Sequence, residues 1–211
     1  MPKTKNHYYD GWFYRKYIDP NLEEVRKIIG EELPGNCSVI DIGCGTGAMS
    51  FSLSSKCRRL VGVELSPRML NFANRQKAQL GLKHVDFVLG DASCLSQFKD
   101  KEFDAAITSM VLHEMPAGLR GPVILEMIRI AREVILADYA IPQPKNFSGY
   151  TTFPVEFVAG PSHFKGFLSF YKNGGLPGLL NSLGIKIEQS TQNSVGTIQI
   201  VKLALDRPPK N

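Results

Sequence analysis

The chain has 211 residues, of which 43% are hydrophobic and 21% are charged, and its formal net charge is +5. This composition excludes an intrinsically disordered chain and suits one domain that buries a core without the help of disulfides. The apolar runs are too short to span a bilayer, and the first residues, MPKTKNHYYDGW, lack the apolar core of a signal peptide. We therefore expect a cytoplasmic protein with no membrane span.

The basic residues and the cysteines lend little support to two common kinds of binding site. Lysine and arginine occur in short groups, with no run of five and no stripe interleaved with aromatics, so a nucleic-acid partner is only weakly supported. The four cysteines are Cys37, Cys44, Cys57 and Cys94, and no two of them have the CxxC spacing of zinc or redox motifs. We expect reduced thiols and no metal site.

Helices and strands alternate over the first two thirds of the chain. The pattern predicts helices over 20–33, 47–56, 66–80 and 117–131, and strands over 37–43, 59–65, 85–91, 103–112 and 133–140. In the helix over 117–131, the side chains expected to face inward are Leu119, Val123, Ile124 and Met127. Alternation of this kind implies right-handed crossovers, so we expect an α/β fold with a doubly wound, mainly parallel sheet covered by helices on both faces.

The pattern changes after Ile141. Residues 142–163 hold prolines, glycines and aromatics without a clear period, which is typical of an irregular functional loop. Helical pieces follow over 164–171 and 176–184, and strands over 185–190 and 196–205 form a C-terminal antiparallel hairpin. We predict a single domain over 1–211, in which an N-terminal lid or helix segment (1–33) and an insertion (141–175) shape a substrate site.

The stretch VIDIGCGTGAMS, residues 39–50, is a glycine-rich turn between a strand and a helix. Gly43, Gly45 and Ala48 satisfy the dinucleotide fingerprint GxGxxG/A, and Glu64 lies at the distance expected for an acid that binds ribose. A site for S-adenosylmethionine fits the same turn. Asp41 favours this second ligand, because a carboxylate repels a pyrophosphate but attracts a sulfonium and an ammonium group. The glycines alone leave both ligands open.

The next two strands point to an adenosyl ligand. The first three predicted strands each end near an acid, namely Asp41, Glu64 and Asp91. The carboxyl ends of parallel strands form the ligand crevice of such sheets. There Glu64 can accept hydrogen bonds from a ribose diol, and Asp91 can accept one from an exocyclic amine. Asp91 can also simply cap a short helix over 92–98.

With these motifs in place, the chain resembles the class I S-adenosylmethionine-dependent methyltransferases. VIDIGCGTG, VGVELSPRML, FVLGDASCL and FDAAITSMVLHEM are similar to four motifs of that family, in the same order, over about residues 37–140. The resemblance implies a Rossmann-like, seven-stranded sheet whose last strand is antiparallel, with S-adenosylmethionine as cofactor and S-adenosylhomocysteine as product. It assigns the cofactor to Asp41, Gly43, Cys44, Gly45, Gly47, Glu64, Leu65, Asp91, Ala92 and Met110.

The acceptor is less well indicated. After the fourth strand there is no Asn/Asp-Pro-Pro-aromatic motif, as in methylases that act on amino groups of nucleic acids, and no Pro-Cys nucleophile. MVLHEM instead resembles the branch of small-molecule enzymes that contains the quinone-biosynthesis methyltransferases. His113 is the candidate catalytic base, with a packed loop histidine as the alternative, and we expect Glu114 to be solvated.

Aromatic residues are the other candidates for acceptor contacts. We expect the N-terminal segment to fold over the cofactor, with Tyr9 or Tyr14 touching it, and Tyr139, His163 and Phe167 to face the acceptor. The predicted activity is transfer of the sulfonium methyl to a small molecule by in-line displacement, driven mainly by orientation. Two alternatives remain: a protein that binds the cofactor without turnover, and a nicotinamide-dependent oxidoreductase.

Overall fold

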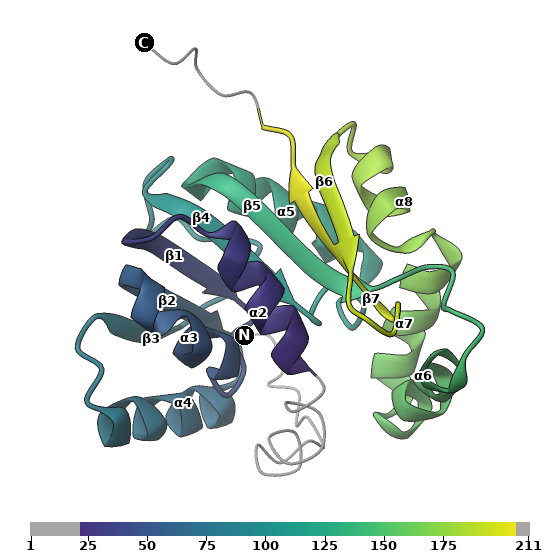
Figure 1. Cartoon of the computed structure of the whole chain (residues 1–211), viewed down its shortest axis with the longest axis horizontal. Coiled ribbons are helices and arrows are strands. Elements are labelled where there is room, and N and C mark those ends of the chain that lie inside the picture. The colour runs from purple at the N-terminus through teal and green to yellow at the C-terminus, as the bar shows by residue number, and fades with distance from the viewer. Residues whose placement is uncertain (1–21, 206–211) are drawn as a thin grey trace.

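A computed structural model shows a seven-stranded sheet with the strand order β3-β2-β1-β4-β5-β7-β6, and it describes residues 22–205 (Figure 1). The strands are β1 (Cys37–Ile42), β2 (Cys57–Glu64), β3 (Val85–Leu89), β4 (Phe103–Ser109), β5 (Ala131–Tyr139), β6 (Ile187–Gln192) and β7 (Ile198–Leu203). The first five are parallel, and β7 runs antiparallel to both β5 and β6. The expected doubly wound sheet and C-terminal hairpin are thus confirmed.

Two apolar cores lie on opposite faces of the sheet, as strands covered on both sides require. In β1, Val39 belongs to the core under α2 (Glu23–Glu32), α3 (Ala48–Leu53) and α4 (Pro67–Leu80). Ile40 and Ile42 belong to the core under α5 (Ala117–Ile130) and α8 (Gly175–Ser182). The same alternation turns Asp41 toward α3, where Ser50 donates a hydrogen bond to it.

Two expectations about the middle of the chain were wrong. The fourth strand ends at Ser109 and not at residue 112, because Met110 has φ +59°, in the left-handed region that ends regular pairing. In α5, Val123, Ile124 and Met127 are buried as expected, but Leu119 is exposed. The buried residue of that first turn is instead Arg120.

The segment expected to be irregular is mostly helical. Residues 147–158 form α6 (Phe147–Val158), and α7 (Pro161–Lys172) begins before residue 164. Asn146 caps α6 by accepting a hydrogen bond from the amide of Gly149, and Gly160 separates the two helices with φ +111°. Figure 1 shows α6 and α7 beyond β5 and β7, at one end of the sheet. The insertion over 141–175 is therefore a helical cover rather than a loop.

The order of the strands determines where ligands can bind. From β1, the chain adds β2 and β3 on one side and then β4 and β5 on the other side. The loops after β1 and β4 therefore flank the topological switch point at the carboxyl edge. The glycine turn follows β1 and the loop with His113 follows β4. Within residues 22–205, no helix is both long and apolar enough to cross a membrane. The predicted lid residues before residue 22 lie outside the described part.

The close packing of α7 against the loop after β4 is testable at Gly166. A Cβ atom there would lie 2.7 Å from the carbonyl oxygen of Glu114 and 2.9 Å from that of His113. Because backbone atoms must move to admit it, Gly166→Ala should lower the free energy of unfolding by about 1–3 kcal/mol in urea titrations. Gly118→Ala, where a Cβ meets nothing within 4 Å, is the control and should be neutral or stabilising by up to about 1 kcal/mol. Equal effects of the two substitutions would contradict this packing.

Candidate functional site

The glycine turn after β1 has a backbone that only glycine adopts readily. Gly43, Gly45 and Gly47 have φ values of +71°, +54° and +85°. A Cβ on Gly43 would lie 2.7 Å from Val111, so this turn packs tightly against the loop after β4. Among residues 22–205, a Cβ on Gly45 would meet no atom within 4 Å. The outer side of the turn is thus open to a ligand that approaches the backbone.

Glu64, at the end of β2, lies against this turn. One carboxylate oxygen accepts a hydrogen bond from the amide of Gly45 at 3.0 Å, and the other accepts one from the amide of Ser66 at 2.7 Å. Burial raises the pKa of Glu64, and the charge of Glu114 adds to this rise. A carboxylate that accepts one hydrogen bond on each oxygen still has lone pairs for a diol. The influence of Glu114 also shows that the loop after β4 lies near this carboxylate.

Asp41 is a buried anion beneath the same turn. It is 2% exposed, and the hydroxyl of Ser50 donates a 2.7 Å hydrogen bond to it. Burial raises the pKa of Asp41 to about 6, partly opposed by this hydrogen bond. Ionised Asp41 therefore costs the fold free energy, unless a cation lies nearby.

The other residues predicted to bind the cofactor lie around the same edge. Asp91 accepts hydrogen bonds from both the amide and the hydroxyl of Ser93, in a segment of turns rather than a short helix. Leu65 is 60% exposed beside the turn, and Cys44 is buried behind it. Ala92 and Met110 are partly buried against the two cores. The predicted cofactor residues are thus gathered on the carboxyl ends of β1 to β4.

The loop after β4 carries a buried imidazole. His113 is 3% exposed, and its Nδ1 lies 2.7 Å from an oxygen of Asp138, which is fully buried in β5. The other oxygen of Asp138 accepts a hydrogen bond from the amide of His113 at 3.1 Å. Burial is the largest single effect on the pKa of His113 and lowers it. The nearby carboxylates, Asp138 first among them, together outweigh burial, so the pKa is raised. Asp138 thus fixes the ring, and Nε2 points away from the sheet.

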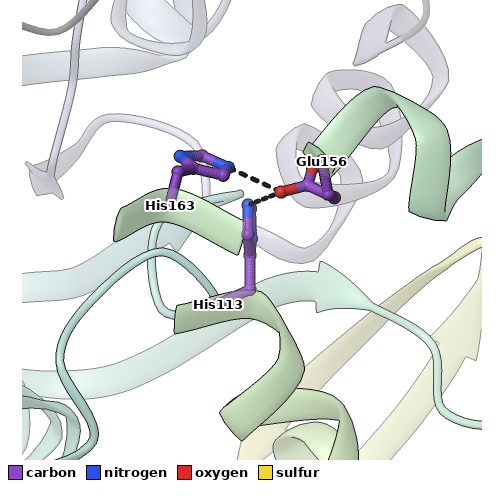
Figure 2. Close-up of side chains that lie close together, drawn as sticks. All are labelled: His113, Glu156 and His163. Carbon is purple, nitrogen blue, oxygen red and sulfur yellow. Dashed lines mark ion pairs between the residues drawn. The ribbon is translucent and has the colours of Figure 1, made fainter. Parts of the chain in front are cut away.

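Glu156 of α6 and His163 of α7 meet the other side of that ring (Figure 2). One oxygen of Glu156 lies 3.7 Å from Nε2 of His113 and 2.6 Å from Nε2 of His163. Nδ1 of His163 lies 3.0 Å from Glu114, and the hydroxyl of Tyr139 donates a 2.7 Å hydrogen bond to the second oxygen of Glu156. Although burial opposes it, contact with Glu114 and Glu156 raises the pKa of His163 to about 9.

Arg120 holds this loop in place. Its guanidinium donates hydrogen bonds to the backbone carbonyls of Leu112, His113, Met115 and Gly166. These bonds join α5, the loop after β4 and α7, and they satisfy polar groups that would otherwise be buried without partners. The positions of His113 and His163 thus depend on one buried arginine.

Four of the residues predicted to form the site lie together around His113. Tyr139, His163 and Phe167 each lie near the ring of His113, with ring centroids 4.9 Å apart for His113–Tyr139 and 5.4 Å for both His113–His163 and Tyr139–Phe167. Tyr9 and Tyr14 lie outside the described residues. Glu156 and Asp138, two acids inside apolar stretches, were not predicted. The expectation that Glu114 is solvated was wrong, because it is half-buried and paired with His163.

Comparison with known proteins shows that part of the chain is similar to methyltransferases. A family model described as "Methyltransferase domain" matches residues 39–133. The 18S rRNA (guanine-N(7))-methyltransferase of Bos taurus is 36% identical over 110 residues, which are 48% of this chain and 37% of that protein. The chain spans about a fifth to two fifths of the length of the curated relatives it matches.

Solved structures match over most of the chain. A SAM-dependent methyltransferase from Aquifex aeolicus is 20% identical with a TM-score of 0.66, over 92% of this chain and 98% of that one. Magnesium protoporphyrin IX methyltransferase from Synechocystis PCC 6803, with SAH bound, is 19% identical with a TM-score of 0.60, over 88% and 82% of the two chains. Residues 39–133 therefore resemble a methyltransferase domain in sequence, and the chain has the fold of these solved methyltransferases.

Because the buried charge of Asp41 is unfavourable, we predict that a substitution that removes this charge stabilises the fold. The folded protein binds a proton at Asp41 more tightly than the unfolded chain, so the free energy of unfolding falls as pH rises from about 4 to about 6. Asp41→Asn should therefore raise it by about 1–3 kcal/mol near neutral pH and change it little near pH 4, in urea titrations.

Asp104→Asn is the matched control and should have the opposite sign. Asp104 accepts hydrogen bonds from Ser38 and pairs with Arg58, and these contacts hold its pKa below the usual value although burial opposes them. Its substitution should lower stability at neutral pH, and this loss should fade as pH falls through the ordinary range for Asp. A loss of stability for Asp41→Asn at neutral pH would contradict the cost assigned to its charge.

Proposed function

We propose that this chain, whose methyltransferase domain has the class I fold, transfers the methyl group of S-adenosylmethionine to a small-molecule acceptor. The observation that carries the proposal is the joint placement of the open glycine turn, buried Asp41 and Glu64 at one edge of the sheet. The loop after β4 and the cover of α6 and α7 adjoin this edge. The proposal thus assigns the cofactor to the strand ends and the acceptor to the space under the helical cover.

The residues at this edge fit S-adenosylmethionine. The open side of Gly45 admits a ligand close to the backbone. Asp41 is a buried anion that accepts its hydrogen bond from the neutral hydroxyl of Ser50, and a positively charged ligand would stabilise it. Glu64 retains acceptor capacity for ribose hydroxyls, and exposed Leu65 offers an apolar surface to the base. A dinucleotide fits less well, because its pyrophosphate would lie near ionised Asp41.

The chemistry requires alignment more than catalytic groups. When bound, the cofactor supplies a methyl group that its sulfonium already activates. The chain's own residues then have to hold the acceptor in line and exclude water, and such positioning contributes about 7–11 kcal/mol in favourable cases. The loop after β4, fixed by Arg120, gives the rigid surface that this alignment needs.

Aromatic residues support a small acceptor with an apolar part. Phe157, exposed on α6, packs on Phe164 with ring centroids 5.3 Å apart, and Phe164 stacks on Phe167 at 6.3 Å. Phe167 contacts Tyr139, which packs on His113. Aromatic surface therefore runs from the outside of the helical cover to the loop after β4. The structural relative from Synechocystis is named for a porphyrin substrate, in line with an acceptor of this kind.

RNA is the second candidate acceptor. Several curated relatives of 30–36% identity are named RNA methyltransferases, and the chain carries a net charge of +5. This likeness is confined to about a fifth to two fifths of those proteins, all of which are named as methyltransferases. It therefore supports the shared cofactor more strongly than a shared acceptor.

The prediction that His113 is a general base is less well supported by its surroundings. Its Nδ1 faces Asp138, its Nε2 faces Glu156, and the side chain is buried. A base has to reach the proton that it removes. The resemblance to the quinone-biosynthesis branch remains a prediction on which the relatives above have no bearing.

Glu64 provides the test of cofactor binding. Glu64→Ala removes the acceptor for ribose and for the amide of Gly45, so the dissociation constant for S-adenosylhomocysteine should rise about 10- to 100-fold, equal to roughly 1.5–3 kcal/mol, by calorimetry. Glu31→Ala, at an exposed position of α2, is the control and should bind as the wild type does. S-adenosylhomocysteine should raise the melting temperature, whereas NADH should not. An unchanged constant for Glu64→Ala would refute the placement of the ribose.

A labelling experiment separates the acceptor classes. The protein is incubated with methyl-labelled S-adenosylmethionine and either total RNA or a metabolite extract that has passed a small-pore filter. We expect label in the low-mass fraction, resistant to ribonuclease. Label that appears only in RNA and is lost on ribonuclease treatment would replace the small acceptor with RNA. Binding of S-adenosylhomocysteine without label in either fraction would favour a protein that binds the cofactor without turnover.

A further inference from the structure

We propose that His113, Glu156 and His163 form a binding site for one divalent transition-metal ion of the zinc type. Their candidate ligand atoms all lie within 4.8 Å of one another, and the three residues come from the loop after β4, from α6 and from α7. Figure 2 shows both imidazoles directed at the same oxygen of Glu156. The site is separate from the residues assigned to S-adenosylmethionine, and the proposal does not depend on methyl transfer.

The carboxylate of Glu156 gives the first argument. Its Oε2 is buried and has no hydrogen bond of acceptable geometry, although Nε2 of His163 lies 2.6 Å away and Nε2 of His113 3.7 Å away. A tetrahedral ion bound at about 2.0–2.1 Å separates its ligand atoms by about 3.3 Å. The longer distance is close to this value, and the shorter one has to open by roughly 0.7 Å. A small movement of the half-buried His163 would therefore make room for an ion.

The surrounding residues give a second, independent argument. Nδ1 of His113 faces Asp138 at 2.7 Å, and Nδ1 of His163 faces Glu114 at 3.0 Å. Histidines that bind metal ions usually have the second ring nitrogen held by a carboxylate, which fixes the ring and raises its basicity. Here this arrangement occurs twice and leaves both Nε2 atoms facing the same point. Tyr139 likewise holds the second oxygen of Glu156.

The charges also favour a cation. With neutral imidazoles, the three carboxylates of Asp138, Glu114 and Glu156 leave a triple negative charge in a largely buried cluster. A divalent ion would neutralise most of this negative charge. Without an ion, protons on the two imidazoles have to neutralise it, and the cluster is then a structural network of ion pairs. These two states make different predictions about metal binding.

The ligand set limits the kind of ion. Two imidazole nitrogens and one carboxylate oxygen suit Zn²⁺ and neighbouring transition metals, whereas Ca²⁺ and Mg²⁺ prefer oxygen ligands throughout. Three protein ligands leave a fourth position for water or for an atom of a bound molecule. His113 lies on the loop that we assign to the acceptor, so a ligand in the fourth position would lie on the acceptor side of the site.

The test measures metal binding directly, without cofactor or acceptor. The full chain is purified without a polyhistidine tag, treated with chelator and titrated with Zn²⁺ in a calorimeter, and the bound metal is measured after gel filtration. His163→Gln removes a half-buried ligand, and Glu114→Gln removes only the carboxylate that orients it. His84→Gln is the control, because His84 contacts the backbone of Ser54, away from the cluster. Circular dichroism and urea titration establish that each variant is folded.

We expect the wild type and His84→Gln to bind about one equivalent of Zn²⁺ with equal affinity. His163→Gln should weaken binding by more than about 100-fold, and Glu114→Gln by about 10- to 100-fold, as for other residues that orient a ligand. Failure of the wild type to bind Zn²⁺ would overturn the proposal and identify the cluster as an ion-pair network. So would binding that a folded His163→Gln variant retains. Binding of S-adenosylhomocysteine, measured on the same samples, reports separately on the proposed function.

Discussion

The order of the sheet is the constraint on which the candidate site depends. Because β1 and β4 are neighbours although two other strands separate them in sequence, the loops after them meet at one edge with nothing between. The contact of Gly43 with Val111 shows how close they are, since even one added carbon atom would collide there. One loop carries the open glycine turn, and the other leads to His113. The strand order alone therefore places the glycine turn and the loop that leads to His113 close to each other.

Buried charge is the second feature of this edge, and it occurs in two forms. Asp41 and Glu64 are carboxylates whose burial raises their pKa. Asp41 accepts a hydrogen bond from the Ser50 hydroxyl, and Glu64 accepts hydrogen bonds from backbone amides. Around His113 the acids are instead paired with imidazoles. The first form suits a site completed by a cationic ligand, and the second suits one completed by protons or by a metal ion. The two regions therefore differ chemically although they adjoin.

The sequence predicted the part of the structure that follows from local patterns. Strands, turns and the crossovers of residues 37–140 depend on apolar runs and glycines, and the structure agrees there to within a few residues, apart from the early end of β4. α6 was missed because Gly149 and Pro154 interrupt its pattern, and packing on α7 outweighs their low helix propensity. The helical period predicted that Leu119 faces inward. Arg120 is buried instead, because its guanidinium donates hydrogen bonds to four backbone carbonyls.

The site itself was predictable only where residue type already indicates chemistry. Histidine and tyrosine are candidates for chemistry wherever they occur, so His113, Tyr139 and His163 were predicted as site residues. The residues that surround them were not predicted. Glu156 lies in the stretch TTFPVEFV and Asp138 in VILADY, and an acid among apolar residues is the signal that was available. Such an acid needs a partner, since an unpaired buried carboxylate is costly. Asp138 pairs with His113, 25 residues before it, whereas Glu156 pairs with His163 on the next helix, so only the fold shows that the two acid–histidine pairs share one point.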